Sequence, residues 1–408
     1  MQKSLVKNIL IISQVYAPDT ASVAQHLRDL AVELSSRGHK ITVVASKHGF
    51  DNDAIYPGSE VLDGVNILRV GHTTFRKRNS FLRMFDFLTC IILMSLRVGR
   101  LKQDFDIVLT STSPPLAGII GALYSKIKKT PFVYWVMDLQ PELAVKSGLL
   151  ATRNPIAILL QYVSDWISIS AYRLIALDEY MSAYLASRGV DKRKIFVSSV
   201  WPVSEGIYDG KRLENPFRVA NDFGDKIVIM FSGNHSFVHP MKTLLETIRE
   251  LKHEKKFLFC FVGGGVRVKE VREFKEKYQI ENIVQYDYQP RSKFHISIGA
   301  SDLQVVLLGD GQVGFTHPNK IYGSMFLGKP IIYIGPNQSH IGDILKKNPG
   351  NLSVEHGESE KLAKMLRDIL LIGEGGIAKI GTKNRAFAEN KFRPERLKQK
   401  IASIIEDT

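Results

Sequence analysis

The chain has few cysteines and no apolar stretch of membrane-spanning length. Of its 408 residues two are cysteines, and both, Cys90 and Cys260, stand in apolar runs. Such cysteines usually behave as small buried hydrophobic side chains, so we expect no disulfide framework and no cysteine metal site. The apolar stretch at residues 87–96 is shorter than the ~20 residues that a spanning helix needs. Residues 9–12 suit a first strand better than the core of a secretory signal.

The usual signatures of nucleic-acid, nicotinamide and metal binding are also missing. The chain has 55 basic and 41 acidic residues and a net charge of +14, which can reflect nucleic acid, a membrane surface or a phosphorylated substrate. No helix-turn-helix, zinc-finger or RNP pattern is present, so we expect no nucleic-acid partner. Residues 263–265 lack the G-x-G-x-x-G spacing of dinucleotide folds. His235, His239 and His317 lack metal-ligand spacing, so we expect no bound metal.

Polar and glycine residues follow the apolar strands predicted in both halves of the chain. Apolar and helix-like segments alternate in each half, which predicts an α/β protein with two doubly wound parallel sheets. The residues at the ends of these strands include Ser13, Ser111, Asp138, Asp178, Ser232, Gly263 and Gly309. Open parallel sheets bind ligands outside the carboxyl ends of their strands. We therefore expect two facing crevices and a ligand held between them.

The same alternation suggests a division into domains. We predict an N-terminal Rossmann-like domain at residues 1–202 and a second one at 203–385. A C-terminal helix within residues 386–408 is expected to return to the first domain. Residues 201–225 contain proline and glycine, and we interpret them as the linker.

An apolar segment flanked by basic residues lies in the first half. Residues 76–78 are basic, residues 81–96 are mostly apolar, and Arg97, Arg100 and Lys102 follow. Such a helix can lie in a membrane interface and attract anionic lipid. It can equally be a core helix with a solvated basic end, because periodicity does not separate the two. We interpret a second apolar helix, which starts at Pro155, as core.

Two turns in the second half could hold a phosphate. Residues 231–242 read FSGNHSFVHPMK, in which Gly233 would let the backbone approach a ligand and the helix start would favour an anion. His239 is the histidine best placed to meet a phosphate. Lys320 opens another predicted helix and could neutralise a diphosphate. The alternatives are an ordinary βα turn and a solvated lysine.

Asp138 ends a central strand of the first half and is followed closely by Glu142. A carboxylate at this place could bind sugar hydroxyls or transfer a proton. The alternative is an N-cap for the next helix.

Taken together, these residues resemble the family 4 retaining glycosyltransferases of the GT-B fold. The resemblance is greatest to the branch that builds bacterial exopolysaccharide, capsule and O-antigen, including the colanic-acid type. It covers nearly the whole chain and is carried by residues 16–19, 37–39, 111–115, 138–142, 232–234, 262–265, 301–302, 318–323 and 328–330.

The resemblance implies two facing Rossmann-like domains and a hexosyltransferase-type enzyme without metal or other cofactor. It would move a sugar from a nucleotide-sugar to a lipid-linked saccharide acceptor, with retention, in polysaccharide or lipopolysaccharide biosynthesis. Asp138 and Lys320 would be catalytic. The donor would lie at Gly233, Asn234, His239, Gly264, Tyr288, Pro290 and Lys320, and the acceptor at Tyr16, Ser113 and Glu142. We expect a cytoplasmic protein that attaches peripherally to the inner face of the cell membrane through residues 76–102.

Two departures from the family keep other functions open. Gly323 stands where many members have the second of two glutamates, so the nucleotide is not defined, and Met137 stands where many have a histidine. A nucleotide-sugar 2-epimerase of the same fold is one alternative, although it would want more carboxylates and histidines at the first-domain strand ends. A non-catalytic partner protein is the other.

Overall fold

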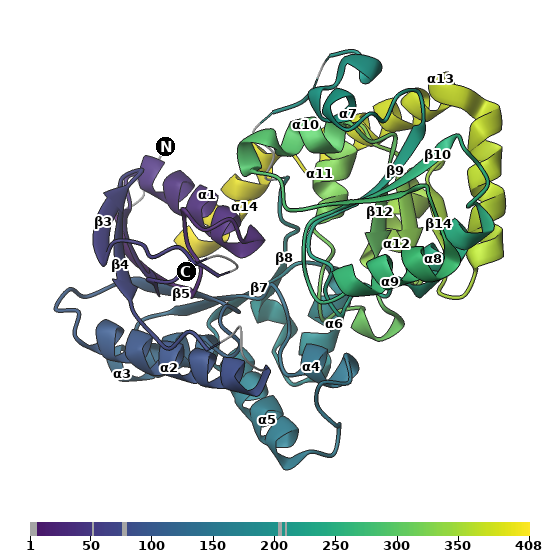
Figure 1. Ribbon diagram of the computed structural model, residues 1–408. Coiled ribbons are helices and arrows are strands. Elements are labelled where there is room, and N and C mark those ends of the chain that lie inside the picture. The colour runs from purple at the N-terminus through teal and green to yellow at the C-terminus, as the bar shows by residue number, and fades with distance from the viewer. Residues whose placement is uncertain (1–5, 51–52, 76–79, 203–205, 209) are drawn as a thin grey trace. The chain divides into compact units, whose positions relative to one another are not determined.

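The computed structural model describes residues 6–50, 53–75, 80–202, 206–208 and 210–408. The chain forms two compact units (Figure 1). Unit 1 comprises Met1–Val200, Gly314–His317 and Glu395–Thr408, and unit 2 comprises Trp201–Val313 and Pro318–Pro394. Each unit is built on one largely parallel sheet. The predicted α/β class with two parallel-sheet domains is therefore confirmed.

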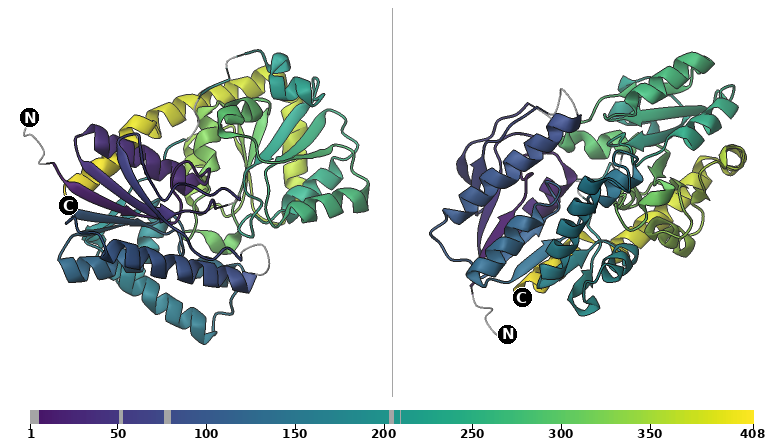
Figure 2. Two further views of the ribbon diagram at one scale, coloured as in Figure 1. Left: turned by 60° about the vertical axis from the view of Figure 1, so that its left-hand side comes forward. Right: turned by 90° about the horizontal axis from the view of Figure 1, so that it is seen from below.

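The sheet of unit 1 has the strand order β3-β4-β2-β1-β5-β6-β7-β8, and every neighbouring pair except β3–β4 is parallel. Its strands are β1 (Asn8–Ile12), β2 (Lys40–Ser46), β3 (Ser59–Leu62), β4 (Val65–Val70), β5 (Ile107–Ser111), β6 (Phe132–Trp135), β7 (Arg173–Ala176) and β8 (Ile195–Val197). Its helices are α1 (Ser22–Ser36), α2 (Ser80–Gly99), α3 (Gly118–Lys128), α4 (Glu142–Lys146), α5 (Pro155–Ser170), α6 (Glu179–Ser187) and α14 (Pro394–Glu406). Helices α2, α3 and α5 lie on one face of the sheet and α1 on the other (Figure 1, Figure 2).

The C-terminal helix α14 is fixed in unit 1 by polar contacts. Glu406 accepts hydrogen bonds from Arg37 Nη1 at 2.7 Å, and its other carboxylate oxygen lies 2.9 Å from His39 Nε2. Arg173 donates to the carbonyl oxygen of Ile404 at 2.8 Å. Arg37 and His39 belong to a motif that supports the family resemblance, and here they hold the end of the chain.

The antiparallel hairpin β3–β4 is not among the elements that the sequence analysis predicts. Asp63 and Gly64 connect its strands with φ values of 53° and 77°. Two consecutive positive φ values are typical of a type I′ turn, for which Asp-Gly is a preferred sequence. The Asp-Gly pair between two short apolar segments was the available signal.

Helix α5 differs from the core helix that we predicted. Asn154 caps it by accepting a hydrogen bond from the N–H of Ile156, and Pro155 occupies the first turn. Ala157 and Ile167 are buried, but Ile158 and Leu159 are exposed, as is Ile156. The core interpretation is wrong for the outward face, because an all-round apolar sequence does not specify which side packs on the sheet.

The sheet of unit 2 has the order β11-β10-β9-β12-β13-β14 and is parallel throughout. Its strands are β9 (Ile227–Ser232), β10 (Phe257–Val262), β11 (Ile283–Tyr286), β12 (Leu303–Leu307), β13 (Ile331–Ile334) and β14 (Leu352–Val354). Its helices are α7 (Pro216–Ala220), α8 (Lys242–Glu250), α9 (Val268–Tyr278), α10 (Phe294–Gly299), α11 (Lys320–Phe326), α12 (His340–Lys347) and α13 (Ser359–Lys391), which is interrupted at Gly373.

Alternate residues of β9 pack into two cores on opposite faces of this sheet. Ile229 and Phe231 belong to one core with Leu244 of α8. Val228 and Met230 belong to the other with Ile298 of α10. Cys260 is buried in the second core, and Cys90 is buried in α2; both are free thiols. Among the helices of the described ranges, none combines the length and apolar character that a bilayer crossing requires.

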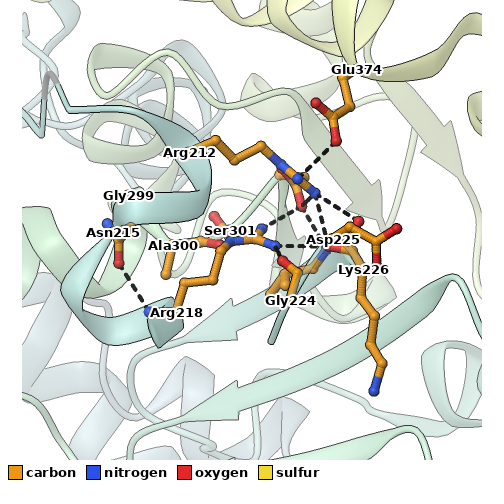
Figure 3. Close-up of polar contacts among 12 residues, drawn as sticks. Arg212, Asn215, Arg218, Gly224, Asp225, Lys226, Gly299, Ala300, Ser301 and Glu374 are labelled. Carbon is orange, nitrogen blue, oxygen red and sulfur yellow. Dashed lines mark hydrogen bonds and ion pairs between the residues drawn. The ribbon is translucent and has the colours of Figure 1, made fainter. Parts of the chain in front are cut away.

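Residues 201–225 are not the plain linker that we predicted, since they contain a 3₁₀ turn at Arg212–Glu214 and helix α7. A buried ion cluster ties both to the sheet of unit 2 (Figure 3). Arg218 donates to one oxygen of Asp302 at 2.7 Å, and Arg212 donates to the other. The N–H of Val228 in β9 also donates to this carboxylate at 2.7 Å. Because unpaired buried charges are costly, the cluster holds the segment in place.

Candidate active site

Three glycines shape the carboxyl ends of β9 and β10 in unit 2. Gly233 has a φ of 118°, and Gly263 and Gly265 have 129° and 128°, values that favour glycine. A Cβ on Gly263 would lie 2.1 Å from the carbonyl oxygen of Gly233, and one on Gly265 would lie 2.5 Å from Asn234 Oδ1. The N–H of His235 donates to the carbonyl oxygen of Gly264 at 2.7 Å. The two turns therefore pack backbone against backbone, and a side chain would separate them.

Lys320, the first residue of α11, directs its ammonium group at this pair of turns. The nitrogen lies 3.5 Å from the centroid of the Phe231 ring. A Cβ on Gly233 would be 3.7 Å from the same nitrogen. Solvent does not reach Nζ, which makes no hydrogen bond within the part of the chain that the structure describes. Burial lowers the pKa of Lys320 to about 7. An anion at the turns would supply the partner that this cation lacks.

Two histidines adjoin Lys320, and both are neutral at pH 7. Burial and the nearby Lys320 lower the pKa of His235 to about 4 and that of His239 well below its usual value. Nδ1 of His235 lies 3.0 Å from the carbonyl oxygen of Gly233, while its Nε2 is buried without a hydrogen-bond partner in the described ranges. Nδ1 of His239 lies 3.0 Å from the carbonyl oxygen of Asn234. They can offer hydrogen bonds, but the positive charge belongs to Lys320.

The other residues predicted at the donor lie at the same edge or just beyond it. The hydroxyl of Tyr288, whose ring is exposed, donates to the carbonyl oxygen of Gly264 at 3.2 Å. Asn234 is exposed in the first turn. Pro290 is exposed as well, and its carbonyl oxygen accepts from the N–H of Lys293 at 2.8 Å. The structure thus gathers Gly233, Asn234, His239, Gly264, Tyr288 and Lys320 around the ends of β9 and β10.

In unit 1, Asp138 follows β6 and is held by two threonines. The N–H of Asp138 donates to Oγ1 of Thr112 at 3.1 Å, and Oγ1 of Thr316 donates to its carboxylate at 2.6 Å. Burial raises the pKa of Asp138, while the Thr316 hydrogen bond and the neighbouring His317 act in the opposite direction. Its carboxylate bonds Thr316 rather than an N–H of α4, whose N-cap, Pro141, makes no side-chain capping bond.

Thr316 belongs to a short segment that lies in unit 1 although its neighbours in sequence belong to unit 2. The carbonyl oxygen of Phe315 accepts from the N–H of Leu139 at 2.8 Å. Nδ1 of His317 lies 2.8 Å from Oδ2 of Asp178, which also caps α6 through the N–H of Met181. The carboxyl ends of β6 and β7 therefore share one polar layer with residues 314–317.

The three residues predicted on the acceptor side have different surroundings. Tyr16 is buried, and burial raises the pKa of its hydroxyl. Ser113 is half-buried, and its carbonyl oxygen accepts from the N–H of Gln14 at 2.7 Å. Glu142 is buried, and one of its oxygens accepts from Tyr184 Oη and Gln161 Nε2, each at 2.9 Å. Of the three, Ser113 is the most accessible, and their role in acceptor binding stays a prediction.

Sequence reasoning did not select His235, Thr316 or Asn319. His235 directly follows two residues that we did select, so its position in the turn was a usable signal. The Oδ1 atom of Asn319 is buried beside Lys320 in sequence and makes no hydrogen bond inside the described ranges. Thr316 gave no signal, because it contacts Asp138 across 178 residues of sequence.

The described residues contain no group of three or more histidine, cysteine, aspartate or glutamate side chains that could hold a metal ion. Metal independence stays a prediction, since it depends on how a ligand is bound.

Comparisons with known proteins bear on both units. Residues 23–199 match the model of Glycosyltransferase Family 4. The probable glycosyltransferase WbjE of Pseudomonas aeruginosa is 24% identical over 313 residues, which are 77% of this chain and 77% of that protein. Sucrose-phosphate synthase of Thermosynechococcus elongatus has a similar structure, with a TM-score of 0.79 at 14% identity, over 98% of each chain.

HepE of Anabaena, solved in complex with UDP and glucose, has a TM-score of 0.74 at 15% identity over 98% of this chain and 100% of its own. At such identities the solved structures show a shared fold. The family match lies in unit 1, whereas the glycine turns and Lys320 lie in unit 2. Residues 23–199 are thus similar to a glycosyltransferase family 4 domain, and the chain has the two-domain fold of the GT-B glycosyltransferases.

Proposed function

We propose that the protein is a glycosyltransferase that binds a nucleotide-sugar donor through its diphosphate at the glycine turns of unit 2. The observation that carries this proposal is Lys320, whose buried ammonium group has no hydrogen-bond acceptor among the described residues. A buried charge is costly without a partner, and a donor diphosphate is an anion of suitable charge. The family 4 domain in unit 1 and the complex of HepE with UDP and glucose support this choice of ligand.

The chemistry assigned to these residues is mostly charge stabilisation and positioning. The bond between the anomeric carbon and the diphosphate breaks, the acceptor hydroxyl oxygen bonds to that carbon on the same face of the sugar, and the hydroxyl proton passes to the departing diphosphate oxygen. Lys320, the backbone N–H groups of the turns and the start of α11 stabilise the negative charge that develops on the diphosphate. Asp138 binds the transferred sugar, and orientation of donor and acceptor supplies much of the remaining rate. Thr316, which holds Asp138, precedes Lys320 by four residues in the sequence.

The finer assignment concerns the acceptor and the pathway. We propose a lipid-linked saccharide acceptor, a retaining reaction and a role in exopolysaccharide or lipopolysaccharide biosynthesis of the colanic-acid type. The sequence motifs support this finer assignment, and the likeness to a probable glycosyltransferase supports sugar transfer. No metal is required in the proposed reaction, because Lys320 takes the charge-stabilising role.

We also propose that residues 76–102 attach the protein peripherally to the inner face of the cell membrane. Residues 76–79, which include three of the predicted basic residues, lie outside the described part of the chain. Within α2, the side chains of Leu88, Ile92 and Leu96 are exposed rather than buried in the core. Arg100 and Lys102 follow at the end of the helix and are exposed. Apolar and basic exposure on one helix fits an anionic lipid interface.

Binding and transfer can be tested in sequence with the full-length protein. UDP-, GDP-, ADP- and TDP-sugars are screened by ligand-observed NMR, with and without EDTA. The donor that binds is then incubated with the protein and a bacterial lipid extract, and sugar incorporation into lipid is followed by mass spectrometry. We expect one nucleotide class to bind with EDTA present and its sugar to appear on lipid. If the folded protein binds none of the donors, the proposal is contradicted and a non-catalytic role is favoured.

A further inference from the structure

Helices α2, α3 and α5 of unit 1 expose apolar side chains along a shared surface. Helix α3 contacts both α2 and α5, and all three lie on one face of the sheet. Figure 2 (right) views this layer from outside the sheet. The exposed apolar side chains are Met84, Phe85, Leu88, Ile92, Leu93 and Leu96 on α2, Leu123 and Ile127 on α3, and Ile156, Ile158, Leu159, Tyr162, Trp166 and Ile169 on α5. A surface with so many neighbouring apolar side chains usually contacts a partner or a membrane.

The outward face of α5 has a regular apolar pattern. Its residues Ile156, Leu159, Tyr162, Trp166 and Ile169 recur every three or four positions and so lie on one side of the helix. Leu159 is 62% exposed and Tyr162 is 71% exposed. The opposite side contains Ala157 and Ile167, which are buried against the rest of unit 1. A helix with one face in the core usually has polar residues on the other, and α5 does not.

The exposed charged side chains on the described parts of these three helices are all basic. On the described parts of α2, α3 and α5 no carboxylate is exposed, because Asp86 is buried and Asp165 is largely covered and paired with Arg188. Exposed basic residues lie on these helices or just beyond their ends: Arg83, Arg100, Lys102, Lys126, Lys128, Lys129 and Arg153. Lys128 also approaches Asp104, outside the helices, at 3.4 Å. An apolar surface with a basic rim is complementary to an anionic membrane.

Aromatic residues give a second indication of the partner. Tyr162 and Trp166 lie on the outward face of α5, and Tyr172 is exposed just after its end. Tyrosine and tryptophan are enriched at the boundary between lipid headgroups and acyl chains, because their rings are apolar and their polar atoms reach water.

We propose that α2, α3 and α5 form one lipid-binding face that docks on an anionic bilayer, with α5 inserting beside α2. This inference rests on the membrane contact in the proposed function and extends it to a helix that sequence reasoning assigned to the core. The occupant is a bilayer rather than a second copy of the chain. A two-fold dimer would place this surface against itself and bring its exposed basic residues together, although the described parts of α2, α3 and α5 expose no carboxylate to pair with them.

Trp166 allows a direct test with the intact protein. The chain has three tryptophans; Trp135 and Trp201 are buried, whereas Trp166 is 38% exposed. Vesicles of phosphatidylcholine and phosphatidylglycerol containing brominated acyl chains should quench the fluorescence of Trp166. Trp166→Phe should remove that quenching, and the remaining fluorescence should be that of the buried Trp135 and Trp201. If the protein cosediments with vesicles but the fluorescence of Trp166 is not quenched, the proposed insertion of α5 is wrong.

A matched pair of variants separates this face from general apolar exposure. Ile156→Gln, Leu159→Gln and Tyr162→Gln together should weaken vesicle binding at least about tenfold, with an unchanged circular dichroism spectrum. Val219→Gln, Leu371→Gln and Ile372→Gln change three exposed apolar residues of unit 2 and should leave vesicle binding unchanged. Wild-type binding by the α5 variant, or loss of a dimer without loss of vesicle binding, would contradict the proposal. Donor binding is measured separately by NMR, so failure of vesicle binding does not count against the proposed transferase.

Discussion

The ammonium nitrogen of Lys320 lies over the ring of Phe231, 3.5 Å from its centroid. A desolvated cation–π contact is worth about 2 kcal/mol, which is less than a buried cation loses by leaving water. Burial lowers the pKa of Lys320 to about 7. A buried cation that makes no hydrogen bond among the described residues destabilises the empty fold. Such an unfavourable group at the carboxyl ends of strands is typical of a binding site.

Removing the charge should stabilise the empty protein. Lys320→Met keeps an unbranched apolar stem, and we expect its free energy of unfolding at pH 6.5 to exceed that of the wild type by about 1–3 kcal/mol. The folded pKa of Lys320 lies below its unfolded value of 10.5, so the cost is complete below pH 7 and disappears as the pH rises toward 10.5. Urea unfolding at pH 6.5 and 9.5 measures it. A variant less stable than the wild type at both pH values would show that the cation supports the fold.

Donor binding should take up a proton. At pH 8 most Lys320 side chains are neutral, because their pKa is about 7, and a bound diphosphate would favour the charged form. Affinity for the nucleoside diphosphate should therefore fall between pH 7 and 9. Calorimetry at pH 8 in two buffers of different ionisation enthalpy measures the uptake, which Lys320→Met should lack. Equal binding enthalpies for the wild type in both buffers would argue against protonation of Lys320.

Asp138 is expected to act in the reaction rather than in donor affinity. Asp138→Asn keeps the size of the side chain but removes its charge, and it should lower kcat about 100-fold or more, with the donor Kd within threefold of wild type. Asp104→Asn changes an aspartate that is 88% exposed and serves as the control. Steady-state kinetics and NMR titration separate the two effects. Normal turnover in Asp138→Asn would remove it from the catalytic residues.

The ion cluster of Arg218 and Asp302 should contribute strongly to the stability of unit 2. Asp302→Asn leaves two arginines without their carboxylate and should lower the free energy of unfolding by about 3–5 kcal/mol. Asp225→Asn removes an exposed partner of Lys256 and should change the free energy of unfolding far less, because solvent screens an exposed pair. Chemical denaturation followed by circular dichroism compares them. Similar small losses in both variants would mean that the cluster contributes little.

Two glycines should respond in opposite ways to alanine. A Cβ on Gly323, inside α11, meets nothing closer than 3.9 Å, so Gly323→Ala should stabilise the protein by about 0.5–1 kcal/mol. Gly263→Ala should destabilise it and weaken donor binding, because its Cβ would lie 2.1 Å from a carbonyl oxygen. Thermal unfolding and NMR titration test both. A destabilised Gly323→Ala would mean that this position is more crowded than the structure indicates.

Most of the fold could be predicted from the sequence where a strand is an uninterrupted apolar run. The prediction placed Ser13 and Gly263 directly after apolar strands, and β1 and β10 end immediately before them. It missed β14, a strand of three residues, and α13, whose sequence contains Gly373, Gly375 and Gly376. Short strands carry little periodic signal, and glycines in a helix hide its pattern. These elements depend on tertiary packing, which a local sequence pattern does not predict.

Only part of the candidate site could be predicted from the sequence. Glycines and a lysine at strand ends follow from the geometry of parallel sheets, so Gly233 and Lys320 were predicted. The hydrogen bond between Thr316 and Asp138 and the outward face of α5 depend on segments far apart in sequence. Local patterns do not show which distant side chain completes a hydrogen bond, or which side of an apolar helix meets the sheet.

The most direct test of the central claim is calorimetric titration of nucleoside diphosphates into wild type, Lys320→Met and Lys255→Met at pH 7 with EDTA present. Lys255 is an exposed lysine in the turn before β10, so its variant controls for net charge. We predict that the wild type and Lys255→Met bind one nucleoside diphosphate equally and that Lys320→Met binds it at least about tenfold more weakly, a loss of ~1.4 kcal/mol or more. Equal affinity in all three proteins would contradict the assignment of Lys320 to the donor diphosphate.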